Sequence, residues 1–215
     1  MKEKLSKPEV VQLLLTLADD VIAAKDQLTD LDAVIGDGDL GVTMTIGFSA
    51  VKESLATANP SNPQEALKAA GMAFADKAAS TFGTLLAAMF MRAADAVKGK
   101  ESIGAAEVAS MLRAAAEGVQ RRGKAKLGDK TVLDALFPAA EAAEQAAAAG
   151  KTLFDCVDAA RAAATQGAEN TINIRSQAGR SSWFGDRTIG VKDPGAAALV
   201  VMLESVARYI RSLDG

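Results

Sequence analysis

Apolar residues recur at intervals of three and four positions in eight segments of the chain. This spacing gathers them on one face of an α-helix, so each segment is expected to be helical. The first segment carries a clear stripe, formed by Val10, Leu13, Leu14, Leu17, Val21 and Ile22. The predicted helices cover residues 8–22, 42–56, 64–78, 81–97, 105–120, 132–149, 152–173 and 193–211. No segment alternates apolar and polar residues convincingly enough to predict a β-strand.

Helix-breaking residues separate these segments. Residues 59–63 contain two prolines, and Gly99 and Gly150 each follow a predicted helix. Most connections are short, which makes consecutive helices antiparallel neighbours. A composition of 49% hydrophobic residues, rich in Ala and with few aromatics, is typical of closely packed helices. Residues 1–215 are therefore predicted to form one all-α domain, an antiparallel up-and-down bundle or barrel of eight helices.

The stretch between the first two helices, residues 31–41, contains the carboxylates Asp32, Asp37 and Asp39. Gly36 and Gly38 interrupt the helical pattern there, so the carboxylates are expected to converge from a tight loop. Carboxylates held close together repel one another unless a cation neutralises them. Oxygen ligands without thiolate or imidazole suit Mg²⁺, Ca²⁺ or Mn²⁺, and a helix N-terminus beside them suits an anion. The stretch therefore predicts a metal-bridged phosphate site.

A second interpretation of this stretch is a solvated turn, which Asp and Gly favour by themselves, and the spacing alone leaves both open. An EF-hand does not fit. A calcium loop beginning at Asp37 requires Glu at its twelfth position, where this chain has Phe48.

Two other loops carry more glycine and charge than a connection requires. Residues 123–131 read either as a solvated hinge or as a flexible wall for an anion or a base. Residues 175–192 exceed the usual length of a connection; they form either a structural loop pinned by Trp183 or a phosphate site built on Arg180 or Arg187. In an up-and-down bundle of eight helices, these loops, the acidic stretch and the turn at residues 79–80 lie at one end. This coincidence favours a ligand site at that end.

The composition excludes several classes of function. The chain has no His, which removes Ser-His-Asp and Cys-His catalysis, phosphohistidine transfer and His-based metal sites. A net charge of −3 and the lack of a basic helix face argue against nucleic acid binding. The single Cys156 fits a core position in a reducing compartment. The N-terminus lacks the apolar run of a signal peptide and no segment resembles a membrane span, so a cytoplasmic location is expected.

Three groups of motifs occur in order along the chain: Leu31–Asp32 with 35–39 and Gly41, 122–125 with 128–131, and Gly179–Arg180 with 189–190 and 193–196. With them the chain resembles the nucleotide-binding L subunit of the dihydroxyacetone kinase family over nearly its whole length. The resemblance implies an eight-helix barrel that binds ADP or ATP at one end. It also implies two Mg²⁺ ions with Asp32, Asp37 and Asp39 as their ligands.

The resemblance further implies a set of nucleotide contacts. The corresponding positions are Leu40, Gly41, Thr43, Ala79, Ser80, Gly123, Val132, Arg180, Asp193, Pro194 and Gly195. The chain departs from the family at two of these places. The family usually has His directly after the last aspartate, where this chain has Leu40, and a longer glycine-rich turn than residues 78–83.

Two functions follow from the resemblance. In the first, the chain is a kinase subunit that transfers a phosphoryl group to dihydroxyacetone or a related small ketose held on a separate K-type subunit, with ATP or a phosphocarrier protein as donor. In the second, the chain is a non-catalytic nucleotide-binding or regulatory homologue, for which the two departures are the evidence. The sugar stays open, as does a homodimeric assembly.

Overall fold

The computed structural model describes residues 2–214, and within them the regular secondary structure is almost entirely helical. The α-helices of the described residues are α1 (Lys7–Ala23), α2 (Lys25–Ile35), α3 (Leu40–Ala58), α4 (Pro63–Lys77), α5 (Thr81–Ala96), α6 (Ala105–Gly123), α7 (Leu133–Ala148), α8 (Leu153–Asn170) and α9 (Pro194–Ser212). Two 3₁₀ segments, η1 (Thr171–Asn173) and η2 (Arg180–Thr188), lie between α8 and α9.

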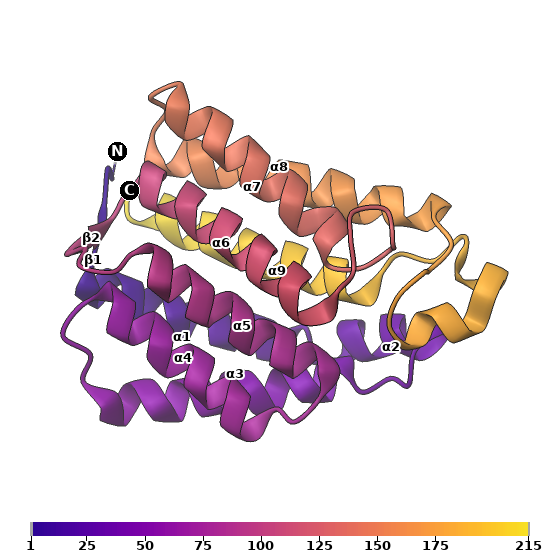
Figure 1. Cartoon of the computed structure of the whole chain (residues 1–215). Helices are drawn as coiled ribbons and strands as arrows, with labels where there is room; N and C mark the ends of the chain where they lie inside the picture. Colours follow the sequence, from indigo (N-terminus) through magenta and orange to yellow (C-terminus); the bar gives the residue numbers. More distant parts are fainter. Residues whose placement is uncertain (1, 215) are drawn as a thin grey trace.

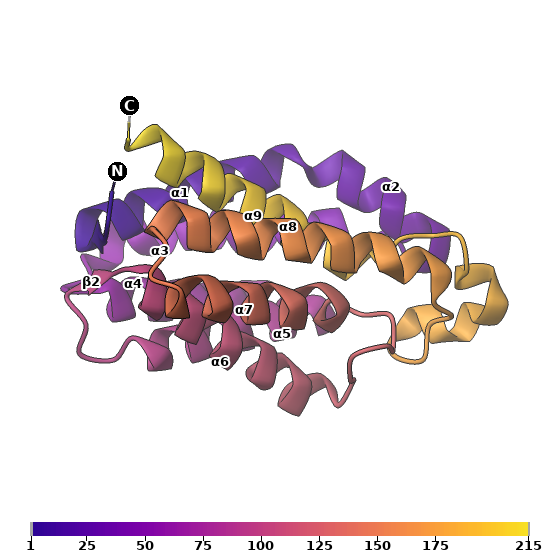
Figure 2. The same cartoon turned by 90° about the horizontal axis from the view of Figure 1, so that it is seen from above.

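Eight of the helices form a closed ring (Figures 1 and 2). Helix α1 packs against α3, each later helix packs against the next, and α9 packs against both α8 and α1. The chain reverses direction between successive helices of the ring, so the ring is antiparallel (Figure 1). Helix α2 forms the connection between α1 and α3, and a long segment connects α8 to α9. The predicted all-α architecture of eight up-and-down helices is confirmed, with α2 as an additional helix.

Helix α2 replaces most of the loop that was predicted after the first helix. The helical conformation is interrupted only at Ala24, and α2 then runs to Ile35. Asp32 therefore lies on a helix and not in a loop. This helix buries only Leu28 and Ile35, because it packs against α3 and α9 at one end of the ring without belonging to it. Two buried residues give no apolar stripe, which is why the pattern did not predict it.

A short antiparallel pair of strands also differs from the prediction of no strand. β1 (Leu5–Ser6) pairs with β2 (Ser102–Ile103), and two residues are too few to show alternation. The pair lies beside the two termini, at the end of the ring opposite to α2 and η2 (Figure 1).

The core depends on close approach between helices. The rings of Phe48, Phe74 and Phe90 meet with centroids 5.0 to 6.3 Å apart. A Cβ on Gly47 would lie 2.0 Å from the ring of Phe74, so the missing side chain lets α3 approach α4. Cys156 is fully buried, and burial raises the pKa of its thiol to about 11, which agrees with the predicted core position.

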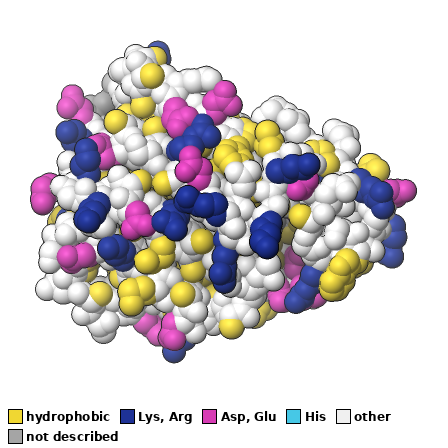
Figure 3. Space-filling model, in the orientation of Figure 1, with side chains coloured by type: hydrophobic (Ala, Val, Ile, Leu, Met, Phe, Trp, Pro, Cys, Tyr) yellow, Lys and Arg dark blue, Asp and Glu magenta, His cyan; other side chains and the backbone are white. Residues whose placement is uncertain are grey.

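The surface carries charges of both signs. On the face drawn in Figure 3, Lys and Arg side chains are interspersed with Asp and Glu. Among the described residues, no helix combines the length and the apolar character needed to cross a bilayer.

Candidate functional site

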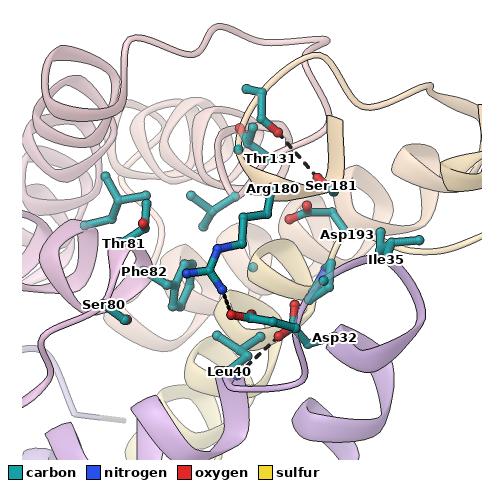
Figure 4. Close-up of a pocket in the computed structure, with 18 of the residues that line it drawn as sticks. Asp32, Ile35, Leu40, Ser80, Thr81, Phe82, Thr131, Arg180, Ser181 and Asp193 are labelled. Carbon is teal, nitrogen blue, oxygen red and sulfur yellow. Dashed lines mark hydrogen bonds and ion pairs between the residues drawn. The ribbon is translucent and has the colours of Figure 1, made fainter. Parts of the chain in front are cut away.

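A pocket opens at the end of the ring where four connections meet (Figure 4). These are the turn between α2 and α3, the turn between α4 and α5, the loop between α6 and α7, and the long segment between α8 and α9. The pocket is lined by Asp32, Ile35, Gly36, Asp37, Asp39, Leu40, Ser80, Thr81, Phe82, Leu85, Lys130, Thr131, Val132, Ala178, Gly179, Arg180, Ser181, Asp193, Pro194 and Gly195. The structure therefore brings together the loops that the sequence assigned to one end.

The three aspartates form a compact cluster at the turn between α2 and α3. One carboxylate oxygen from each of Asp32, Asp37 and Asp39 lies within 4.8 Å of the others. A Cβ on Gly36 would lie 2.2 Å from Oδ1 of Asp32, so a glycine at this position makes room for the carboxylate. Gly38 has φ 71°, a left-handed conformation that glycine adopts without strain. The glycines thus permit the turn that gathers the acidic side chains.

The electrostatics of the cluster favour a bound cation. Burial and the negative charge of Asp32 both raise the pKa of Asp39. The backbone N–H of Leu40, at the start of α3, donates to Oδ2 of Asp32 at 3.3 Å, and it orients this carboxylate towards the helix N-terminus. Three hard oxygen donors with no sulfur or nitrogen ligand beside them fit Mg²⁺.

Arg180 reaches into the cluster from the opposite wall. Figure 4 shows its side chain extending across the pocket between Phe82 and Asp193, and its guanidinium forms an ion pair with Asp37. Both partners are about half exposed, at 53% for Arg180 and 42% for Asp37. The positive charge of Arg180 therefore lies where a metal ion would neutralise the same carboxylates.

Asp193 contributes a fourth carboxylate at the start of α9. Its Oδ2 accepts the backbone N–H of Ala196 at 2.7 Å and so caps the helix. Burial is the main cause that raises the pKa of Asp193 to about 7, and the negative charges of Asp134 and Asp32 raise it further. The hydrogen bond from Ala196 and the positive charge of Lys130 lower it. This acid is therefore poised to change its protonation near neutral pH.

The predicted nucleotide contacts fall into two groups. Leu40, Ser80, Val132, Arg180, Asp193, Pro194 and Gly195 line the pocket with the three aspartates, whereas Gly41, Thr43, Ala79 and Gly123 do not. A Cβ on Gly41 would lie 2.1 Å from the carbonyl oxygen of Lys25, so this glycine lets α3 pack closely against α2. Thr43 is buried behind it, while Ala79 and Gly123 are exposed. These four residues therefore do not form part of the pocket wall.

Several lining residues were not among the predicted contacts. Ile35, Phe82 and Leu85 give the pocket an apolar wall, and Lys130 and Thr131 contribute from the loop before α7. Phe82 and Leu85 fall on the apolar face of the helix predicted over residues 81–97, and periodicity does not distinguish a pocket wall from the core. Ile35 belongs to the acidic stretch, whose pattern points to its carboxylates and glycines.

The sequence profile of the DAK2 domain matches residues 34–208, which is most of the chain. The chain belongs to the DAK2 domain family. One DAK2 relative is the ADP-binding subunit DhaL of the PEP-dependent dihydroxyacetone kinase of Escherichia coli K12. It is 34% identical over 203 residues, covering 94% of this chain and 97% of DhaL. The D-erythrulose kinase of Mycolicibacterium smegmatis is 36% identical over 197 residues, which cover 89% of this chain and 33% of that kinase.

A solved DAK2 relative supports the fold. The dihydroxyacetone kinase of C. freundii, in complex with AMP-PNP and Mg²⁺, superposes with a TM-score of 0.72 at 22% identity, covering 97% of this chain and 35% of that one. The family profile and the curated relatives confirm the resemblance to the L subunit and the expectation of a phosphotransferase of the dihydroxyacetone kinase family. The solved structure confirms the all-helical fold.

Proposed function

We propose that this chain is the nucleotide-binding subunit of a dihydroxyacetone-type kinase, with Asp32, Asp37 and Asp39 holding Mg²⁺ and ADP or ATP lying in the pocket. The observation that carries the proposal is the convergence of three carboxylates within 4.8 Å of one another and beside Arg180. A homologue named as an ADP-binding subunit and covered almost completely supports the nucleotide. A relative solved with AMP-PNP and Mg²⁺ supports the metal.

The pocket residues would have different roles in phosphoryl transfer. Mg²⁺ would neutralise the charge that develops on the transferred group, which is the main requirement of this chemistry. Asp32, Asp37 and Asp39 would hold the metal ion in place. Arg180 is positioned to exchange its carboxylate partner for a phosphate oxygen. The N-terminus of α3 offers backbone N–H groups beside the cluster. Phe82, Leu85 and Val132 provide an apolar surface for the base.

The acceptor would be a small ketose, dihydroxyacetone or a relative of it, bound on a separate K-type subunit. This chain has no His with which to hold a ketose covalently, and no general base in it is required if the partner handles the sugar hydroxyl. The name of the E. coli relative, a PEP-dependent kinase, favours a bound ADP recharged by a phosphocarrier protein over free ATP. Two Mg²⁺ ions, as the resemblance implies, would be shared among the three carboxylates.

Replacing Asp37 with Asn tests the proposal, because it removes one charge from the cluster with little change in shape. Calorimetry should show that Mg²⁺-dependent ADP binding is lost or weakened by at least about tenfold, as expected for a charged ligand contact. Asp30→Asn is the matched control, since Asp30 is an exposed carboxylate on α2 outside the cluster. Equal ADP affinities for both variants would refute the metal assignment.

A non-catalytic homologue is the second candidate. Leu40 is 4% exposed and lines the pocket where the family usually has His, so it offers no side-chain donor to a phosphate. The turn before α5 is short, and Ser80 uses its hydroxyl to cap that helix through Gly83. Phosphoryl transfer assayed with the K-type subunit of a relative separates the two candidates: Mg²⁺-dependent ADP binding without transfer would favour this one.

A further inference from the structure

Lys130 is a fully buried lysine on the loop before α7. Its Nζ donates to the backbone carbonyls of Thr171 at 2.9 Å and Ile174 at 3.1 Å, and also to those of Thr188 and Val191. An ammonium has three N–H donors, so four carbonyls occupy its whole bonding capacity. Although Lys130 lines the pocket, it has no donor left for a ligand.

The four carbonyls lie at the two ends of one segment. We call residues 175–187, which follow η1 and carry Arg180, the Arg180 loop. Thr171 and Ile174 precede this loop, whereas Thr188 and Val191 follow it, so a single ammonium joins its entry to its exit. Gly190 N–H also donates to the carbonyl of Ile172 at 2.8 Å across the same junction.

A second contact ties the Arg180 loop to the loop before α7. The N–H of Gln177 donates to the carbonyl of Asp129 at 2.9 Å, directly beside Lys130. Ser176 N–H donates to Oγ1 of Thr188 at 3.0 Å, which closes the base of the loop further. Between these tethers and Arg180, no described residue of the loop makes an ion pair with the ring helices. These hydrogen bonds hold the base of the loop, while η2 packs against α2.

Burying this ammonium is costly, which argues that its position matters. A charged group removed from water is tolerated only when hydrogen bonds or opposite charges replace its hydration. Burial lowers the pKa of Lys130 and the nearby charge of Asp193 raises it. The residue also has φ 61°, a left-handed conformation that side chains other than Asn, Asp and Gly seldom adopt. Solvation and backbone conformation both oppose this placement, so the carbonyl contacts must offset them.

We propose that Lys130 is a positioning residue for the nucleotide site: its ammonium joins the two ends of the Arg180 loop to the loop before α7 and thereby holds Arg180 over the aspartates. The effect on nucleotide binding rests on the proposed function, because it requires Arg180 to contact phosphate. The effect on the loop itself does not.

Lys130→Met tests this inference, because Met keeps an unbranched side chain as far as Cε and lacks the ammonium. A Met at this position has the same strained left-handed backbone conformation as the lysine. Lys192→Met is the matched control: Lys192 lies just beyond the same loop, but its Nζ is paired with Glu169 on the surface. Hydrogen–deuterium exchange reports on loop opening, and the fluorescence anisotropy of Trp183 reports on loop mobility, since Trp183 is the only Trp of the chain and lies in η2.

We call the hydrogen bonds of the Lys130 ammonium to the carbonyls at both ends of the Arg180 loop the clamp. The clamp predicts a specific pattern of changes in Lys130→Met. In Lys130→Met, the amides of Ser176, Gln177 and Gly190 should exchange roughly 10- to 100-fold faster, the range expected when a charged hydrogen bond is lost. Trp183 anisotropy should fall, while exchange in α7 to α9 stays unchanged. Affinity for Mg-ADP should fall by a similar factor, and Lys192→Met should resemble the wild type in all three measurements.

The possible outcomes distinguish a failure of the clamp from a failure of the proposed function. Unchanged exchange and anisotropy in Lys130→Met would overturn the clamp, whatever the nucleotide does. A looser loop with undiminished Mg-ADP affinity would overturn the positioning role alone. If the wild type binds no Mg-ADP, the proposed function fails, and the exchange data still decide the clamp.

A measurement on the wild type covers the case in which Lys130→Met does not fold. Acetic anhydride should label the exposed Lys126 much faster than the enclosed Lys130. Slow labelling of Lys130 supports the clamp, and equal labelling rates would overturn it.

Discussion

Arg180→Ala is expected to change metal binding and nucleotide binding in opposite directions. Without a nucleotide, the Arg180 guanidinium occupies Asp37, so Mg²⁺ must displace it to reach that carboxylate. Removing the arginine removes this competition. The same arginine is proposed to hold a phosphate oxygen once ADP is present, and the variant then loses a contact.

The structure sets the size of each effect. The Arg180–Asp37 pair is about half exposed, and pairs of this kind contribute about 0.2–1 kcal/mol. Mg²⁺ alone should therefore bind about 1.4- to 5-fold more tightly to the variant. A charge-assisted bond to phosphate is worth about 1.5–3 kcal/mol, so ADP in saturating Mg²⁺ should bind roughly 10- to 100-fold more weakly.

Calorimetric titrations of Mg²⁺, with and without ADP, measure both effects in the same protein. Arg187→Ala is the matched control, because Arg187 lies in the same 3₁₀ segment and stacks over Phe184 at 5.5 Å outside the pocket. Weaker binding of Mg²⁺ alone, or an unchanged affinity for ADP, would contradict the assignment of Arg180. A loss of ADP binding in Arg187→Ala instead would move the phosphate contact to that residue.

Two further predictions concern single pocket residues. Asp193 has a folded-state pKa of about 7, above its ordinary value of 3.8, so its ionisation destabilises the folded state as pH rises from about 4 to about 7. Thermal melts should show Asp193→Asn gaining stability relative to the wild type over that range, and a difference independent of pH would contradict this. Leu40→His should tighten Mg-ADP binding by roughly one to two decades, because the imidazole donates to phosphate. Leu40 is buried, so the variant should also melt at a lower temperature, and ADP affinity no better than that of the wild type would refute a missing contact.

The ring was predictable because each of its helices buries a continuous apolar face, such as Leu14, Leu17 and Val21 on α1. Helix α2 was not, because it packs against α3, α9 and η2 at one end of the ring and buries only two side chains. Because α2 was not predicted, the position of Asp32 on a helix was not predicted either.

The acidic cluster was predictable because Asp32, Asp37 and Asp39 are close in the sequence and separated by helix-breaking glycines. Gly41 shows the limit of this reasoning. A glycine can serve anion binding or close helix packing. Only the structure shows that a side chain at position 41 would collide with the carbonyl of Lys25.

The contacts of Lys130 could not be inferred from local sequence, because its four carbonyl partners lie 41 to 61 residues away along the chain. The ion pair of Arg180 with Asp37 likewise joins two loops whose relative position depends on the closed ring. Patterns within one segment identify which residues carry chemistry, whereas the ring decides which of them meet.

Anomalous diffraction from crystals grown with Mn²⁺ and ADP tests the central claim most directly. Mn²⁺ prefers the same oxygen ligands as Mg²⁺ and can be located by its own scattering. We expect a Mn²⁺ peak among the carboxylates of Asp32, Asp37 and Asp39, with ADP phosphates against it and Arg180 released from Asp37. Mn²⁺ bound elsewhere, or ADP bound while the Arg180–Asp37 pair stays intact, would contradict it.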